Sequence, residues 1–133
     1  MVIVDSDVWS EAFRRKPDSW SPQVKRLQKL IDKEEILMIG PIRQEVLSGL
    51  RESKRYDAIR KALRSWLDEP LKTEVFEMAA SFYNLCRSKG VQGSHTDFLI
   101  CSCAVSWDAE ILSRDNDYKQ YAKHIPIQLC RRL

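Results

Sequence analysis

Short apolar runs separated by longer amphipathic stretches repeat along the whole chain. The runs occupy residues 2–4, 36–39, 110–113 and 125–129 and are rich in aliphatic and β-branched side chains, which is typical of strands buried in a parallel sheet. Pro126 has no amide hydrogen to give to a neighbouring strand, so the last strand is expected at an edge of the sheet. The pattern predicts an α/β fold built on an open parallel sheet.

Helical spacing of apolar residues fills the intervals between these strands. Helices are expected at about 8–13, 22–31, 42–50, 54–67, 75–86, 97–107 and 118–123. The fourth helix is expected to turn Trp66 and Leu67 inward and to end before Pro70. The stretch 97–107 is apolar on nearly all sides, which predicts a largely buried helix at the centre of the core.

Length and composition favour one globular domain spanning residues 1–133, with 44% hydrophobic and 31% charged residues. No apolar run approaches the roughly 20 residues needed to span a bilayer, and no basic segment leads into an apolar stretch at the N-terminus. The four cysteines are therefore interpreted as buried thiols of a reduced, cytoplasmic protein. Cys101 and Cys103 point in different directions on a predicted helix, which argues against a zinc site.

Positive charge is concentrated in one segment, although the net charge of +3 is small. The segment contains Arg51, Lys54, Arg55, Arg60, Lys61 and Arg64, offset by Glu52 and Asp57. A nucleic-acid backbone would be attracted to such a surface. A solvated helix face is the alternative interpretation, and charge alone favours it.

Acidic residues stand at the points where a parallel sheet would bring them together. Asp5 ends the first apolar run, Asp115 follows the third, and Glu45 and Asp97 lie in two of the predicted helices. The carboxyl ends of parallel strands share one edge of a sheet, where ligands bind. Carboxylates held close together repel one another unless a cation neutralises them, and Mg²⁺ is a natural occupant of such a site.

Each of these acids also has a structural interpretation. Asp5 could interact with a helix dipole, and Asp115 could cap a short helix. Asp97 follows Ser94 at the spacing of a capping box, and Glu45 could face solvent. The four together form a constellation that capping does not require.

Four short segments together resemble the motifs of the PIN-domain ribonucleases, and among them the VapC-type toxins of type II toxin-antitoxin pairs. The segments read VDSDVW from Val4, RQEV from Arg43, TDFLI from Thr96 and LSRDNDY from Leu112. The resemblance covers essentially the whole chain, and the order and spacing of the motifs fit. It implies a three-layer α/β/α sandwich with a small, mostly parallel central sheet.

The resemblance also implies a set of site residues. The metal ligands and catalytic acids would be Asp5, Glu45, Asp97 and Asp115, with Asp117 as an auxiliary acid and the hydroxyls of Ser6 and Ser113 as supports. Asp7 departs from the Asn or Ser that is more usual in the family. Either it adds a negative charge to the site or its side chain points elsewhere.

The function implied by the resemblance is hydrolysis of RNA phosphodiester bonds by an endoribonuclease that uses Mg²⁺, or Mn²⁺ as a substitute, and thereby inhibits translation and growth. One of the acids would accept the proton of the attacking water. The expected partners are the RNA substrate, a cognate VapB-like antitoxin and a second copy of the chain, joined through the early helices. No membrane is expected among the partners.

Two other functions remain open from the residues alone. The segment from Val2 to Val8 also fits the signature of haloacid-dehalogenase-like phosphatases, with Asp5 as nucleophile and Asp7 as general acid. That reading lacks a convincing lysine and Ser/Thr motif and gives Glu45 and Asp97 no role. A non-catalytic module that binds RNA or a partner through the basic segment is the other alternative, and retention of all four acids speaks against it.

Overall fold

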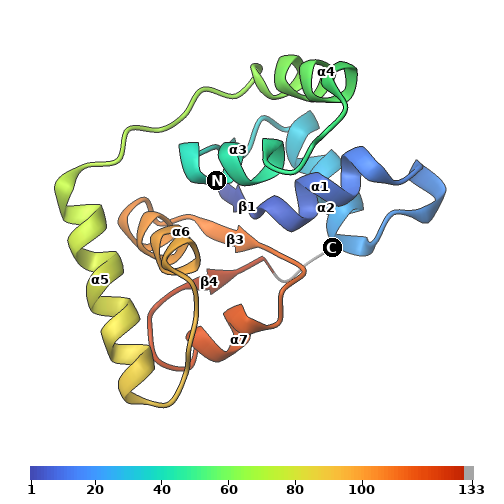
Figure 1. The fold of residues 1–133 in the computed structure, drawn as a ribbon. Helices are drawn as coiled ribbons and strands as arrows, with labels where there is room; N and C mark the ends of the chain where they lie inside the picture. Colours follow the sequence, from blue (N-terminus) through green and yellow to red (C-terminus); the bar gives the residue numbers. More distant parts are fainter. Residues whose placement is uncertain (131–133) are drawn as a thin grey trace.

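The computed structural model describes residues 1–130 and shows a small sheet surrounded by helices (Figure 1). The elements in chain order are β1 (Val2–Val4), α1 (Ser6–Arg14), a 3₁₀ helix (Pro17–Ser19), α2 (Pro22–Asp32), β2 (Ile36–Leu37), α3 (Gly40–Leu47), α4 (Ser53–Leu63), α5 (Thr73–Ser88), α6 (His95–Ser106), β3 (Glu110–Leu112), α7 (Asp117–Tyr121) and β4 (Gln128–Leu129). Strands alternate with helices along most of the chain, as predicted.

The described strands form one parallel sheet in the order β2-β1-β3-β4. The central strand β1 pairs on one side with β2, where Val2 lies opposite Ile36, and on the other with β3, where Val4 lies opposite Leu112. Strand β4 lies at an edge, which confirms the prediction drawn from Pro126. The parallel direction brings the carboxyl ends of β1 and β3 together, and the candidate acids follow these ends.

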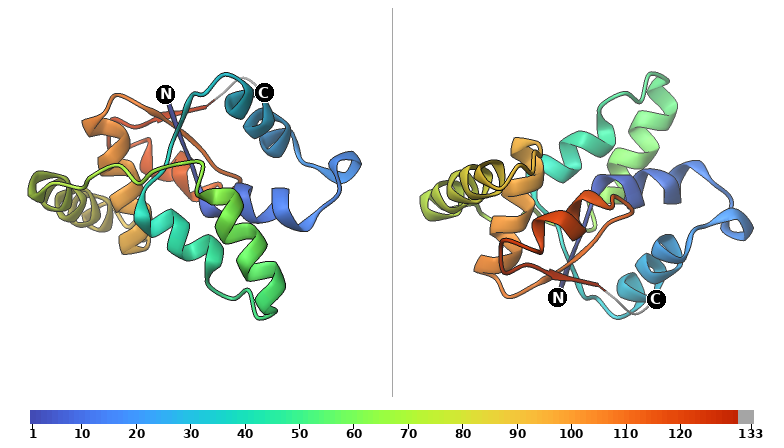
Figure 2. Two further views of the ribbon diagram at one scale, coloured as in Figure 1. Left: turned by 90° about the horizontal axis from the view of Figure 1, so that it is seen from above. Right: turned by 90° about the horizontal axis from the view of Figure 1, so that it is seen from below.

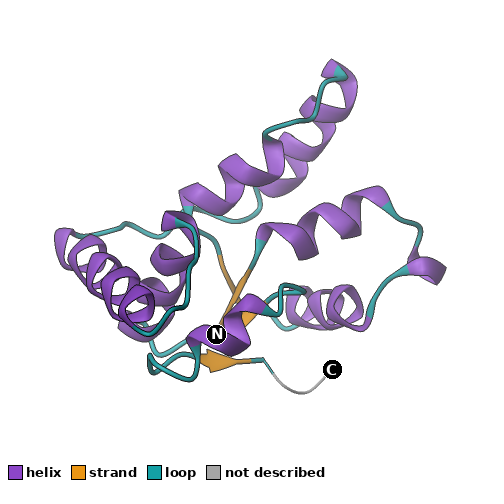
Figure 3. Cartoon of the chain, turned by 60° about the horizontal axis from the view of Figure 1, so that its bottom comes forward, coloured by secondary structure: helices purple, strands orange, loops and turns teal. Residues whose placement is uncertain are grey.

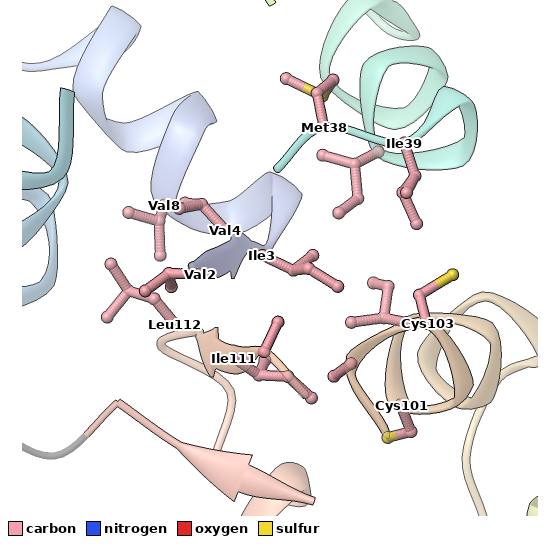
Figure 4. Packing of buried hydrophobic residues seen from close by; sticks show 14 of the residues in the cluster. Val2, Ile3, Val4, Val8, Met38, Ile39, Cys101, Cys103, Ile111 and Leu112 are labelled. Atoms are coloured by element: carbon pink, nitrogen blue, oxygen red, sulfur yellow. The ribbon is translucent and has the colours of Figure 1, made fainter. Parts of the chain in front are cut away.

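Successive side chains of the strands point to opposite faces of the sheet and are buried on both. Figure 4 shows Ile3 and Ile111 on the side of helix α6, which contributes Cys101 and Cys103, whereas Val4 and Leu112 lie on the other side. Burial on both faces explains why these strands read as continuous apolar runs. The expected α/β/α sandwich is confirmed.

The helices gather into groups around the sheet. Figure 2 shows α5 lying along α6 on one flank and α1 with α2 on the opposite flank, and Figure 3 shows how little of the chain the strands occupy between them. The hydroxyl of Ser102 in α6 is completely buried and donates to the carbonyl oxygen of Val75 in α5, at 2.6 Å. Helix α6 is therefore the central core helix that its sequence predicted.

The helix predicted at 54–67 is shorter than expected, because α4 ends at Leu63. The side chain of Arg43 in α3 provides a reason: its guanidinium donates to the carbonyl oxygens of Leu63 and Trp66 and pairs with Asp68 at 2.9 Å. The chain then extends beside the end of β2 instead of continuing as a helix. The predicted inward position of Leu67 is wrong, since this residue is 85% exposed.

Three strands are also shorter than their apolar runs, β3 by the single residue Ser113. The run 36–39 forms only β2, because Met38 makes an isolated bridge with Asp68 and Ile39 already precedes helix α3. The run 125–129 pairs only over Gln128 and Leu129. The apolar runs therefore located the strands correctly but extended them past the hydrogen-bonded ladder.

Cys86, Cys101 and Cys103 are buried, as predicted, and Cys130 is half-buried. Burial raises the pKa of Cys103 to about 12, so its thiol stays protonated at neutral pH. Within residues 1–130, no helix has the length and apolar character required to cross a bilayer.

Candidate acidic active site

Asp5 links the two central strands at their carboxyl ends. It directly follows β1 and is the N-cap residue of α1, where its Oδ1 accepts a hydrogen bond from the amide of Ser6 at 2.8 Å. Its Oδ2 accepts a hydrogen bond from the hydroxyl of Ser113, just after β3, at 2.9 Å. Only 7% of Asp5 is exposed. Asp5 therefore stands at the helix N-terminus, as its dipole interpretation expects, while its other oxygen connects to a distant part of the chain.

The hydroxyl of Ser113 connects Asp5 to the loop that carries Asp115. It accepts a hydrogen bond from the amide of Asp115 at 3.0 Å while donating to Asp5. The carboxylate of Asp115 in turn accepts from the amide of Asp117 at 2.9 Å. Asp115 and Asp117 are both exposed, so this part of the site faces solvent.

Asp97, in the first turn of α6, uses its carboxylate differently from the capping-box expectation. The hydroxyl of Ser94 does accept a hydrogen bond from the amide of Asp97, at 3.0 Å. The carboxylate of Asp97, however, accepts from the hydroxyls of Tyr121 at 2.7 Å and Tyr118 at 3.4 Å. Both phenols belong to α7, so the acid is held toward the segment that carries Asp117.

Gly93 is needed at this contact because the Tyr121 ring lies against its backbone. A side-chain Cβ at position 93 would overlap the hydroxyl of Tyr121 and the ring of Phe98. Burial and the hydrogen bond to Asp97 both raise the pKa of Tyr121, so this phenol remains a donor at neutral pH. Sequence reasoning gave neither Gly93 nor the two tyrosines a role.

Glu45 reaches the group from α3, on the other side of Asp5. Its Oε1 accepts a hydrogen bond from the hydroxyl of Ser6 at 3.1 Å. The residue is exposed, and this contact directs its side chain toward the start of α1. The two serines implied as supports therefore each contact an acid of the set, Ser6 contacting Glu45 and Ser113 contacting Asp5.

The structure brings the predicted acids to one edge of the sheet in two subsets. Asp97, Asp115 and Asp117 offer carboxylate oxygens that all lie within 4.8 Å of one another. Asp5 is outside this compact group and connects to it through the hydroxyl of Ser113 and the charge of Asp97, whereas Glu45 contacts only Ser6, the residue after Asp5. The arrangement is an acidic cluster with the oxygen donors that a hard divalent cation prefers.

The electrostatics of the cluster are those of uncompensated negative charge. Burial, followed by the charge of Asp7, raises the pKa of Asp5 to about 7, and Asp97 contributes to the rise. The charge of Asp115 raises the pKa of Asp117. Among residues 1–130, no lysine, arginine or histidine forms an ion pair with any of these carboxylates.

Asp7 adds its charge to the site and does not point elsewhere. Its Oδ2 accepts hydrogen bonds from the amide of Arg114 at 3.0 Å and, at 3.4 Å, from the hydroxyl of Ser113. Its Oδ1 is buried and has no hydrogen-bond partner within the described part of the chain. Burial raises the pKa of Asp7 as well. A buried carboxylate oxygen without a partner beside further acids fits a bound cation.

Glu11 was missed by sequence reasoning, which assigned the stretch 8–13 only an apolar helical pattern. Its side chain is completely buried, accepts a hydrogen bond from the amide of Ser21 at 2.7 Å and lies 2.5 Å from the guanidinium of Arg114. Burial alone would raise the pKa of Glu11, but the hydrogen bonds from Ser21 and the charges of Arg114 and Arg15 lower it. Nothing in the local spacing of charges marks this long-range pair.

Comparison with known proteins identifies one family. The family model described as PIN domain matches residues 2–124. The VapC ribonuclease Mb1587 of Mycobacterium bovis and the ribonuclease VapC11 of Mycobacterium tuberculosis are each 27% identical to the chain over 130 residues, which is 96% of both sequences compared.

Two crystal structures share the fold at low sequence identity. FitAcB from Neisseria gonorrhoeae matches with a TM-score of 0.76 and 15% identity over 98% of this chain and 97% of that one. VapBC2 from Rickettsia felis, bound to a DNA fragment from its promoter, matches with a TM-score of 0.78 and 16% identity over 98% of both chains.

Proposed function

Because the chain belongs to the PIN domain family, we propose that it is a Mg²⁺-dependent endoribonuclease that hydrolyses RNA phosphodiester bonds and serves as the toxin of a toxin-antitoxin pair. Its activity inhibits translation and growth. The observation that carries this proposal is the convergence of acids from β1, α3, α6 and the loop after β3 on one edge of the sheet. The relatives named as VapC ribonucleases support the same reaction.

The metal ligands and catalytic acids in this proposal are Asp5, Glu45, Asp97 and Asp115, with Asp117 as an auxiliary ligand. A bound Mg²⁺ or Mn²⁺ lowers the pKa of a coordinated water and offsets negative charge on the phosphate. The raised pKa of Asp5 and the unpartnered oxygen of Asp7 support a cation at this place.

The side chains around the acids keep their oxygens directed into the site. Ser113 donates to Asp5, and the two tyrosines of α7 donate to Asp97. One carboxylate of the set accepts the proton of the attacking water, directly or through a second water. Hydrogen bonds from neutral hydroxyls orient these carboxylates without supplying the positive charge that would compete with a metal ion.

The RNA backbone binds along the basic face of α4 in this proposal. The exposed positive side chains of the segment include Lys54, Arg55, Lys61 and Arg64. Helix α4 packs against α3, which carries Glu45, one of the proposed acids. Acids at the reaction centre repel the phosphates of RNA, and cations beside them provide the compensating attraction.

We further propose a cognate VapB-like antitoxin, a homodimer formed through the early helices, and a cytoplasmic location. The solved VapBC2 structure supports a partner of this class, and the buried thiols support a reducing compartment. A single continuous hydrophobic core supports treating residues 1–133 as one domain, of which 131–133 lie outside the described residues.

Cleavage of RNA by the purified protein tests the central proposal. Asp97→Asn should abolish cleavage in Mg²⁺ without loss of fold, because it removes one ligand charge. Asp18→Asn is the matched control, since it removes an equal charge from an exposed residue of the 3₁₀ helix and should cleave like the wild type. Wild-type turnover that persists in EDTA would contradict a metal-dependent mechanism.

The phosphatase alternative makes a different prediction and is not favoured. It gives no role to Glu45 and Asp97, although Asp97 lies among the clustered oxygens and Glu45 accepts a hydrogen bond from Ser6. Its general acid would be Asp7, which is occupied by the amide of Arg114. Turnover of small phosphate monoesters with no cleavage of RNA would reverse this preference.

A further inference from the structure

Glu11 and Arg114 form an ion pair that joins the last turn of α1 to the loop carrying Asp115. Glu11 is completely buried, while the Arg114 side chain is 38% exposed. One Glu11 oxygen accepts a hydrogen bond from the amide of Ser21, the N-cap residue of α2. The other Glu11 oxygen lies 2.5 Å from Nη1 of Arg114. That second oxygen has no hydrogen bond within residues 1–130, so the Arg114 charge is what neutralises it.

Arg114 stands between a serine that contacts Asp5 and the acid Asp115, and its own amide contacts a further acid. Its neighbours are Ser113, whose hydroxyl donates to Asp5, and Asp115, a proposed ligand. Its own amide donates to Asp7 at 3.0 Å. Anchoring the Arg114 side chain therefore restrains the whole loop segment 113–115, from which three contacts with the acids originate.

We infer that the Glu11–Arg114 ion pair is a positioning device that fixes the loop 113–115 so that Asp5 and Asp115 can share one divalent cation. The inference rests on the proposed function and adds two residues to it that are not among the proposed metal ligands. Groups that orient metal ligands through one intervening contact typically change metal affinity by about 10–100-fold when removed. The pair has a second consequence: it keeps the guanidinium of Arg114 directed at Glu11 and away from the proposed metal ligands.

Mg²⁺ affinity, measured by calorimetry on the folded protein, is the direct test. Glu11→Gln keeps the size of the side chain and its acceptor for Ser21 but removes the charge that holds Arg114. We expect its affinity for Mg²⁺ to fall by about 10–100-fold. At saturating Mg²⁺ its RNA cleavage should return toward the wild-type rate, which a general folding defect would not allow.

Further variants separate positioning from simple loss of stability. Arg114→Lys retains the charge and should retain most of the Mg²⁺ affinity. The double variant Glu11→Gln/Arg114→Gln should lose no more affinity than Glu11→Gln alone, because either change already breaks the pair. It leaves no unpaired buried charge, so it remains informative if Arg114→Gln alone fails to fold.

Asp68→Asn is the control, since it breaks the Arg43 ion pair at a place that contacts none of the acids.

The outcomes are distinguishable from a failure of the proposed function. A wild-type protein without saturable Mg²⁺ binding would overturn the proposed function and this inference with it. A wild type that binds Mg²⁺, beside a Glu11→Gln variant that binds it equally well, would overturn only the inference. Equal losses in Glu11→Gln and Asp68→Asn would do the same, because they would reflect stability alone.

Discussion

Asp5 and Glu11 are two buried carboxylates, one at the N-cap and the other in the last turn of helix α1, and their surroundings differ in charge. Glu11 lies beside Arg114, and hydrogen bonds and positive charge overcome burial to lower its pKa. Asp5 has hydrogen bonds as well, but the charged groups near it are acids, and its pKa rises to about 7. The fold supplies its own cation for Glu11 and none for Asp5, which distinguishes a structural carboxylate from one that suits a bound metal.

Replacing each acid by its amide should produce the largest contrast. Asp5→Asn removes a proposed ligand and should reduce RNA cleavage by roughly 10³-fold or more, since metal stabilisation of the transition state is worth several kcal/mol. The unfolding temperature of the metal-free protein should stay the same or rise, because the amide has no charge to bury. Glu11→Gln should instead lower the unfolding temperature. Cleavage assays and thermal melts of both variants measure this contrast. If Asp5→Asn cleaved RNA as fast as the wild type, the proposed difference between the two acids would be wrong.

The pH dependence of stability should have opposite signs for the two acids. Between the ordinary pKa of 3.8 and about 7, the folded protein keeps a proton on Asp5 that the unfolded chain releases, so metal-free stability falls as the pH rises through this window. The fall amounts to up to about 4 kcal/mol. Glu11 contributes stability above its ordinary pKa of 4.5, which is lost as the pH falls through its lowered value.

Denaturant unfolding of the metal-free protein at a series of pH values measures this dependence. The decline between pH 4 and 7 should flatten in Asp5→Asn, since that variant has no proton to release at this position. A wild type whose stability rises steadily from pH 4 to 7 would mean that Asp5 is ionised at little cost. That result would remove the distinction between the two carboxylates.

Divalent cations should stabilise the protein by binding at the site that contains Asp5, and not near Glu11. At Mg²⁺ concentrations near one hundred times the dissociation constant, binding to the folded state adds about 3 kcal/mol. The wild type should therefore melt at a higher temperature in Mg²⁺ than in EDTA, and Asp5→Asn should show little of this shift. A shift of the same size in Asp5→Asn would place the ion elsewhere.

The sequence located the acids that the structure brings to one edge of the sheet, but not the contacts that position them. Asp5, Glu45, Asp97 and Asp115 stand at strand ends and helix starts, so local patterns locate them. The partnership of Glu11 with Arg114 spans most of the chain, and the room that Gly93 leaves for Tyr121 depends on packing between α6 and α7. Local periodicity carries no information on such long-range contacts.

The same difference explains the error in the predicted length of α4. Helix α4 was predicted to continue to residue 67 because Trp66 and Leu67 maintain its apolar spacing. It ends earlier because Arg43, from another helix, binds the carbonyl oxygens at its C-terminus. Trp66 still packs edge-on against Trp9 with ring centroids 4.9 Å apart, without being part of the helix.

The smallest expected effect concerns the basic face of α4, where a change should leave both carboxylates undisturbed. Lys54 and Lys61 are exposed and two helical turns apart, so they lie on the same side of the helix. Each of Lys54→Gln and Lys61→Gln should weaken RNA binding and reduce the slope of log affinity against log salt by about 0.7, the value for one phosphate contact with single-stranded nucleic acid.

The measurement is RNA binding at several salt concentrations, made in an Asp97→Asn background to prevent cleavage. Lys25→Gln on α2 is the matched control, because it removes an equal charge from an exposed helix position outside the basic segment. Unchanged slopes in both α4 variants would mean that this face is only solvated. Mg²⁺ affinity should stay at the wild-type value in all three lysine variants. A change in that affinity would show that the acidic cluster responds to distant charge. The difference between Asp5 and Glu11 would then not depend on their immediate neighbours alone.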